Sequence, residues 1–268
     1  MGDGSARDSY LNGFFLLLKK RKMKNLNLKT KDRNEEYSRI AKKYSKRISE
    51  YDGVIGVAVG GGIGRGHSDE FSDIDIFIFL DSETYKKWKK KSPIPEGDHH
   101  YEDYWIETEF FDYEEEKEGV WGIEDRWERK HHVILFDKNS KIRNLYKKKL
   151  IFGEEEKKKI YKHLSDKTGW YIAELPNVWI KRGNIPQAHY VMNTGIDWII
   201  EYIFLQNNYF TPWAKWKLHY VFLMNKLPKD FRKNILETMK IKNYTEKDVL
   251  RRQKILIKIL KQLDLYKE

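Results

Sequence analysis

The stretch VAVGGGIGRGHSDEFSDIDIFIFL, residues 57–80, is the part of the chain from which its fold can be predicted. It begins with a short apolar run that suits a strand and is too short for a helix. Five of the seven residues 60–66 are glycine, and a second apolar run, Ile76–Leu80, ends the stretch. This order predicts two strands joined by a turn whose backbone N–H groups are open to phosphate oxygens.

Two aspartates, Asp73 and Asp75, stand at the start of the second apolar run. Side chains alternate along an extended chain, so residues two apart point to the same face. Paired carboxylates on one face can hold one or two hard divalent cations, which prefer oxygen ligands. A turn or capping role would explain Asp73 but not Asp75, because an unpaired charge in an apolar strand is costly. Together with the glycine turn, the pair predicts a nucleoside triphosphate held on magnesium.

The spacing of Gly61-Gly62, ten further residues and Asp73-Ile74-Asp75 resembles the signature of the polymerase-beta-like nucleotidyltransferases. Arg65-Gly66 and residues 71–80 most resemble the lincosamide- and aminoglycoside-type members, which carry a C-terminal helical domain. The resemblance is specific over residues 40–112 and fainter beyond. It implies an α+β protein, in which an N-terminal nucleotidyltransferase domain with a mixed sheet precedes a helical bundle.

The resemblance also implies roles for individual residues. Asp73 and Asp75 would bind Mg²⁺, with Mn²⁺ as an alternative, and Gly61 and Gly62 would let the backbone approach the phosphates. Many relatives carry serine where this chain has Gly62, so one hydroxyl contact is lost here. Further nucleotide contacts are expected from four residues: Arg65, Gly66, Ser72 and Lys215.

A third carboxylate is expected from the resemblance on a neighbouring strand, here over residues 104–111. Glu107 and Glu109 are two apart and face the same way, so alternation alone leaves both open. In the lincosamide-type enzymes the acidic residue precedes a short apolar run ending in Phe-Asp, and Glu107 stands five residues before Asp112. This register favours Glu107, either as a metal ligand or as a general base toward the acceptor hydroxyl.

Composition limits the class of protein. The chain has 268 residues, of which 40% are hydrophobic and 35% charged, enough for a sizeable globular core. The absence of cysteine excludes disulfides, thiolate metal sites and a cysteine nucleophile. The formal net charge of +11 favours anionic partners such as nucleotides or nucleic acid, although solvated lysine-rich helix faces would explain it as well.

Sequence patterns divide the chain into three expected parts. Residues 1–33 are expected as a partly ordered leader, in which Met23 is an alternative start and residues 1–22 a non-native extension. Alternating strands and helices predict a catalytic domain over residues 34–153. Helical periodicity over residues 154–268 predicts a bundle for substrate binding or oligomerisation, with a homodimer as one form. No segment is long and apolar enough to span a bilayer, so a cytoplasmic protein is expected.

Two further patterns carry alternative interpretations. Trp213, Trp216 and Tyr220 fall on one helical face, which suits core packing or, in a cleft, stacking on an acceptor or base. His131 and His132 precede a strand, where adjacent residues point to opposite sides, so a surface pair is favoured over a metal site.

The expected activity is transfer of a nucleotidyl group from a nucleoside triphosphate, with ATP expected, to a hydroxyl of a small molecule. An antibiotic is one candidate acceptor, and pyrophosphate is the leaving group. Two alternatives stay open: transfer onto RNA or protein, as in minimal nucleotidyltransferase antitoxin systems, and a non-catalytic nucleotide-binding module.

Overall fold

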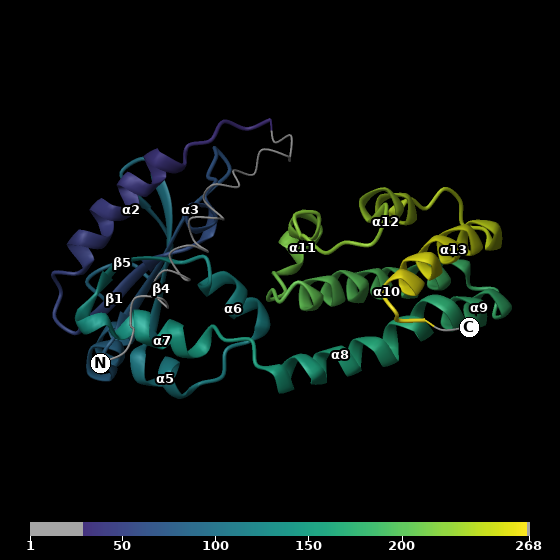
Figure 1. Ribbon diagram of the computed structural model, residues 1–268. Coiled ribbons are helices and arrows are strands. Elements are labelled where there is room, and N and C mark those ends of the chain that lie inside the picture. Colours follow the sequence, from purple (N-terminus) through teal and green to yellow (C-terminus); the bar gives the residue numbers. More distant parts are fainter. Residues whose placement is uncertain (1–28, 267–268) are drawn as a thin grey trace. The chain divides into compact units, whose positions relative to one another are not determined.

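The computed structural model describes residues 29–266, so most of the predicted leader lies outside the described residues. The chain forms two compact units. The first runs to Gly122 and takes in Glu128–Leu150, and the second consists of Ile123–Trp127 and the chain from Ile151 onward. Figure 1 labels most of the helices and some of the strands of the two units.

A mixed five-stranded sheet forms the centre of the first unit (Figure 1). Strands β2 and β4 run parallel, whereas the other neighbouring strands pair antiparallel. A parallel pair needs a crossover connection, which helix α4 (Ser82–Lys90) and the edge strand β3 supply here. The order is β3-β4-β2-β1-β5, with β1 (Val54–Val59), β2 (Ile74–Leu80), β3 (Gly97–Tyr101), β4 (Tyr104–Asp112) and β5 (Val133–Asp137).

Helices cover both faces of this sheet because β1 and β2 carry apolar side chains toward both sides. Helix α2 (Asn34–Ile48) packs Tyr37, Ile40 and Tyr44 against one face. Helix α7 (Lys141–Lys149) packs against the other face. The remaining helices of this unit are short: α3 (Gly61–Arg65), α5 (Tyr113–Glu118) and a 3-10 turn at Lys138–Ser140. Helix α6 (Ile123–Arg129) is divided between the two units.

Strand β3 was not among the predicted strands, and its residues are mostly polar. The segment Gly97–Tyr101 pairs antiparallel with β4, and Glu102, with a φ of 54°, turns the chain between them. An edge strand has one solvated side and needs few apolar residues, so its sequence carries little strand signal.

The second unit is helical, which confirms the predicted C-terminal helical region. A π-helical turn, Trp170–Glu174, follows the helix that begins at Glu154. It lies just before Pro176, whose ring has no N–H to donate within a helix. The helices are α8 (Glu154–Gly169), α9 (Leu175–Lys181), α10 (Ile185–Gln206), α11 (Ala214–Val221), α12 (Phe231–Met239) and α13 (Glu246–Gln262). Within residues 29–266, no helix is both long and apolar enough to cross a membrane.

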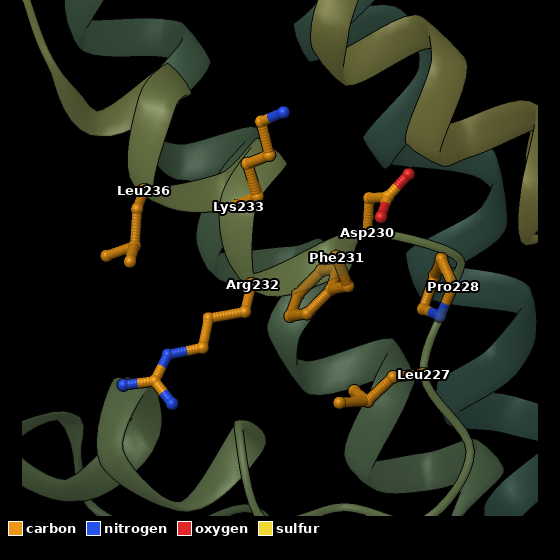
Figure 2. A pocket seen from close by; sticks show the side chains of 7 residues that line it. All are labelled: Leu227, Pro228, Asp230, Phe231, Arg232, Lys233 and Leu236. Carbon is orange, nitrogen blue, oxygen red and sulfur yellow. The ribbon is translucent and has the colours of Figure 1, made fainter. Parts of the chain in front are cut away.

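A hollow lies at the start of α12 on the surface of the second unit (Figure 2). The side chains of Arg232 and Lys233 extend away from each other there, with the ring of Phe231 between apolar neighbours. Asp230 is the single carboxylate among its lining residues, so the lining offers no acidic pair for a shared cation. The lining comprises Leu227, Pro228, Asp230, Phe231, Arg232, Lys233 and Leu236.

Candidate metal and nucleotide site

Three carboxylates gather at one end of the parallel strand pair in the first unit. Asp73 directly precedes β2, Asp75 is its second residue, and Glu107 lies on β4. One oxygen from each carboxylate lies within 4.8 Å of the other two. This spacing fits a divalent cation bound at about 2.1 Å from each oxygen after small side-chain rotations. The residue types and the geometry therefore suit magnesium or manganese.

The register of β2 and β4 distinguishes Glu107 from Glu109. The Cα partner of Asp75 across the parallel pair is Glu107, whereas Glu109 pairs with Phe77. Glu107 is half-buried beside Asp75, and Glu109 is exposed. Glu107 is thus the glutamate that the structure brings to the two aspartates, and its chemical role stays a prediction.

The carboxylates make the site strongly electronegative around Asp75. Burial, followed by the charges of Asp73 and Glu128, raises the pKa of Asp75 to about 7, and Glu107 adds to this effect. Arg65 opposes the shift but does not cancel it. A bound cation would relieve the same repulsion that favours the protonated acid, so the electrostatics fit a metal site.

Gly61 is required where the backbone meets Asp75. Its φ is +54°, and a Cβ at this position would lie 1.4 Å from Oδ2 of Asp75. The N–H of Gly60 donates to the backbone oxygen of Asp75 at 3.0 Å, which fixes this close approach. Glycine therefore supplies both the left-handed backbone and the space that the carboxylate occupies.

Glycine at position 62 is also required for steric reasons. A Cβ there would lie 2.7 Å from the backbone oxygen of His67 and 2.9 Å from Oγ of Ser68. A serine at this position would push the following loop away. Glycine at position 62 therefore allows this loop to lie close to the start of α3.

The glycine-rich segment forms helix α3 rather than an open bend. The helix ends at Gly66, whose φ of 86° is the left-handed conformation typical of a glycine helix terminus. The N–H of Gly61 donates to Oε1 of Glu128 at 3.0 Å. Nη1 of Arg65 donates to the same carboxylate at 3.0 and 3.2 Å. The predicted contact of Arg65 with a triphosphate stays a prediction, since its guanidinium already has a protein partner.

Glu128 is the residue of this region that sequence reasoning missed. It lies on α6, more than sixty positions beyond Gly61, in a segment of mixed charges without a recognisable motif. Its closeness to Asp75 arises from tertiary structure alone, so no local pattern could have identified it.

The remaining predicted contacts have different local settings. The Ser72 hydroxyl donates to Oδ1 of Asp69 at 3.1 Å and accepts the Asp69 N–H at 3.0 Å, so it fixes a turn beside the carboxylates. Lys215 is exposed on α11 of the second unit, and its predicted nucleotide contact stays a prediction. Trp213 precedes that helix and is exposed, whereas Tyr220 is buried.

The prediction of a surface pair at His131 and His132 is wrong, because both side chains are buried. The ring of His132 lies 4.1 Å from that of Phe77 between centroids, and its Nδ1 is 2.7 Å from the Tyr146 hydroxyl. Burial lowers the pKa of His132 well below its ordinary value. The pair precedes β5 rather than lying on it, so strand alternation does not apply to these residues.

One comparison with known proteins bears on this site. Residues 41–178, more than half of the chain, match the family model of the nucleotidyltransferase domain. No curated protein matches the sequence. A solved structure of a nucleotidyltransferase-like protein from Exiguobacterium sibiricum 255-15 is similar at 11% identity and a TM-score of 0.45, over 85% of this chain and 74% of that one. The matched family range contains the three carboxylates and the glycine segment, and the chain belongs to the nucleotidyltransferase domain family, as a transferase of that type.

Proposed function

We propose that the protein transfers a nucleotidyl group from a magnesium-bound nucleoside triphosphate to a hydroxyl of a small molecule. The observation that carries this proposal is the cluster of Asp73, Asp75 and Glu107 beside the backbone of Gly61. A bond forms between the acceptor oxygen and the α-phosphorus. The bond between the α-phosphorus and the α–β bridging oxygen breaks, and pyrophosphate is released. ATP is the expected nucleotide, Mn²⁺ an alternative metal and an antibiotic one candidate acceptor.

The three carboxylates would have different roles in the reaction. Asp73 and Asp75 would hold the cation, and magnesium, when bound, neutralises charge on the phosphate oxygens and the leaving group. Glu107 would complete the ligand set or accept the proton of the attacking hydroxyl. Because the pKa of Asp75 is raised to about 7, ionisation of this carboxyl would accompany cation binding near neutral pH.

Two other functions are compatible with the same site. Transfer onto RNA or protein is the second candidate function, and the net charge of +11 favours a polyanionic partner. A non-catalytic nucleotide-binding role would use the same residues but predicts binding without turnover. A cytoplasmic location and a homodimer stay predictions.

The test uses nucleoside triphosphates labelled at the α-phosphate, with magnesium, and panels of hydroxylated small molecules, RNA and proteins. Label on a small molecule supports the proposal, and label on RNA or protein supports the second candidate. Binding without transfer to any acceptor would favour the non-catalytic role. An absence of metal-dependent nucleotide binding would contradict the proposed site altogether.

A further inference from the structure

An exposed phenylalanine stands next to the carboxylate cluster without any packing role of its own. Phe71 leaves 83% of its surface accessible, the largest exposure of an aromatic side chain among the described residues. It lies in the loop between α3 and β2, two residues before Asp73. The neighbouring strand β2 instead buries its phenylalanines, Phe77 and Phe79. The exposure of Phe71 therefore belongs to the loop and not to a generally apolar surface.

The loop that carries Phe71 is held in one conformation by several hydrogen bonds. The Phe71 N–H donates to Oδ1 of Asp69 at 3.1 Å, and the same oxygen accepts the Ser72 hydroxyl at 3.1 Å. Ser68 is fully buried, and its backbone oxygen accepts the Arg33 N–H at 2.7 Å. An aromatic ring on a loop fixed at both sides can bind a ligand at little further cost in the conformational entropy of the loop.

The short distance along the chain from Phe71 to the carboxylate cluster suggests which ligand its ring contacts. Two residues of extended chain span about 7 Å at most, so the Phe71 backbone lies within that distance of Asp73. A nucleotide whose phosphates lie at the carboxylates must place its sugar and base beyond them. We propose that Phe71 is a nucleotide-binding contact on which the base of the substrate nucleotide stacks, an inference that rests on the proposed function.

The chemistry of the side chain favours a nucleobase over the acceptor as its partner. Every base offers a flat π-face to an aromatic ring, and such stacking tolerates any base because it uses no hydrogen bonds. Phenylalanine has no polar group with which to read a base edge. Phe71 should therefore strengthen the binding of all four nucleotides to a similar extent, whereas it adds nothing to the binding of the phosphate chain.

The experiment measures binding by calorimetry with manganese, using ATP, GTP, CTP, UTP and inorganic tripolyphosphate as separate probes. Phe71→Ala should weaken the binding of nucleotides about five- to a hundredfold and leave that of tripolyphosphate unchanged. Phe71→Trp should restore or exceed the wild-type affinity for nucleotides. Val120→Ala, which also removes an exposed apolar side chain from the first unit, is the matched control and should change neither affinity.

Equal nucleotide affinities in wild type and Phe71→Ala would overturn the inference and leave the proposed function standing. A parallel loss for nucleotides and tripolyphosphate would also overturn it, because it would mean that Phe71 only supports the loop. An altered acceptor KM with an unchanged nucleotide Kd would assign the ring to the acceptor and reject the base. Absence of nucleotide binding in the wild type would overturn both this inference and the proposed function.

Discussion

The two units differ in what surrounds their clustered acidic side chains. In the first unit, Asp73, Asp75 and Glu107 converge, and burial together with neighbouring carboxylates raises the pKa of Asp75 to about 7. In the second unit, Asp197 and Glu201 also lie together, but Nζ of Lys217 is 2.8 Å from one and 2.6 Å from the other. Burial would lower the pKa of Lys217, but its hydrogen bonds to both acids outweigh burial and raise it.

The difference separates a binding site from a structural ion cluster. The second unit pairs its partly buried acids with its own lysine. Its fully buried Arg252 donates hydrogen bonds to Thr238, His189 and Asn193. In the first unit, the charges of Asp73 and Glu128 outweigh that of Arg65 around Asp75, and this repulsion costs stability in the absence of a cation. Proteins retain such costs at functional sites, so the comparison supports the cluster as the place where a cation binds.

The largest expected effect comes from Asp75→Asn, which removes a predicted metal ligand and keeps the side chain's shape. We expect nucleotidyl transfer to fall at least about a hundredfold, because losing even an indirect metal contact typically costs ten- to a hundredfold. The label-transfer assay described above measures the loss. Asp197→Asn makes the same change in the other cluster and should leave transfer nearly unchanged. Similar activities of the two variants would remove the distinction between the clusters.

The second prediction tests which glutamate is the third carboxylate of the site. Glu107→Gln should reduce transfer at least tenfold, whereas Glu109→Gln should reduce it less than about twofold. The reason is the strand register, which pairs Glu107 with Asp75 and Glu109 with Phe77. Steady-state rates at saturating nucleotide measure both variants. A greater loss in Glu109→Gln would show that the functional acid lies at the other position.

The third effect concerns stability rather than activity. Lys217→Met should lower the free energy of unfolding by about 2 kcal/mol, because it leaves Asp197 and Glu201 without their cation. Urea unfolding measures the change, and Lys217→Met combined with Glu201→Gln should regain part of it. Metal-free Asp75→Asn should instead be at least as stable as the wild type. A destabilised Asp75→Asn would mean that the first cluster, too, is mainly structural.

The smallest effect is a pH dependence that belongs to Asp75. The folded chain holds a proton on this carboxyl up to about pH 7, whereas the unfolded chain releases it near pH 4. Stability of the metal-free protein should therefore fall between these values and change no further above them. We expect a difference of about 1 kcal/mol between wild type and Asp75→Asn, since water partly screens the half-buried group. Parallel pH profiles of the two proteins would contradict this prediction.

Local sequence patterns were sufficient where one strand or one turn carries the information. The two strands predicted on either side of the glycines are β1 and β2, and the period-two spacing of Asp73 and Asp75 placed both carboxylates in one cluster. The need for glycine at position 61 was predicted from backbone approach to phosphate. The structure adds a second reason, because the Asp75 carboxylate occupies the space of a side chain.

Features that depend on pairing between distant segments could not be predicted in the same way. Strand β3 exists because β4 offers a partner, although its sequence GDHHY has little strand preference. Glu128 reaches Gly61 and Arg65 through the packing of α6. His131 and His132 were assigned to the surface from strand alternation. The burial of His132 depends on Phe77 and Tyr146, which no local pattern brings to its side.

The parallel alignment of β2 and β4 has a consequence for how this protein can vary. Because backbone pairing positions Asp75 opposite Glu107, the loop of residues 91–96 between α4 and β3 can gain or lose length without displacing either acid. A single residue inserted within β2 or β4 would instead rotate every later side chain to the reverse side. Natural or engineered diversity should therefore collect in that loop, while the two strands keep their length.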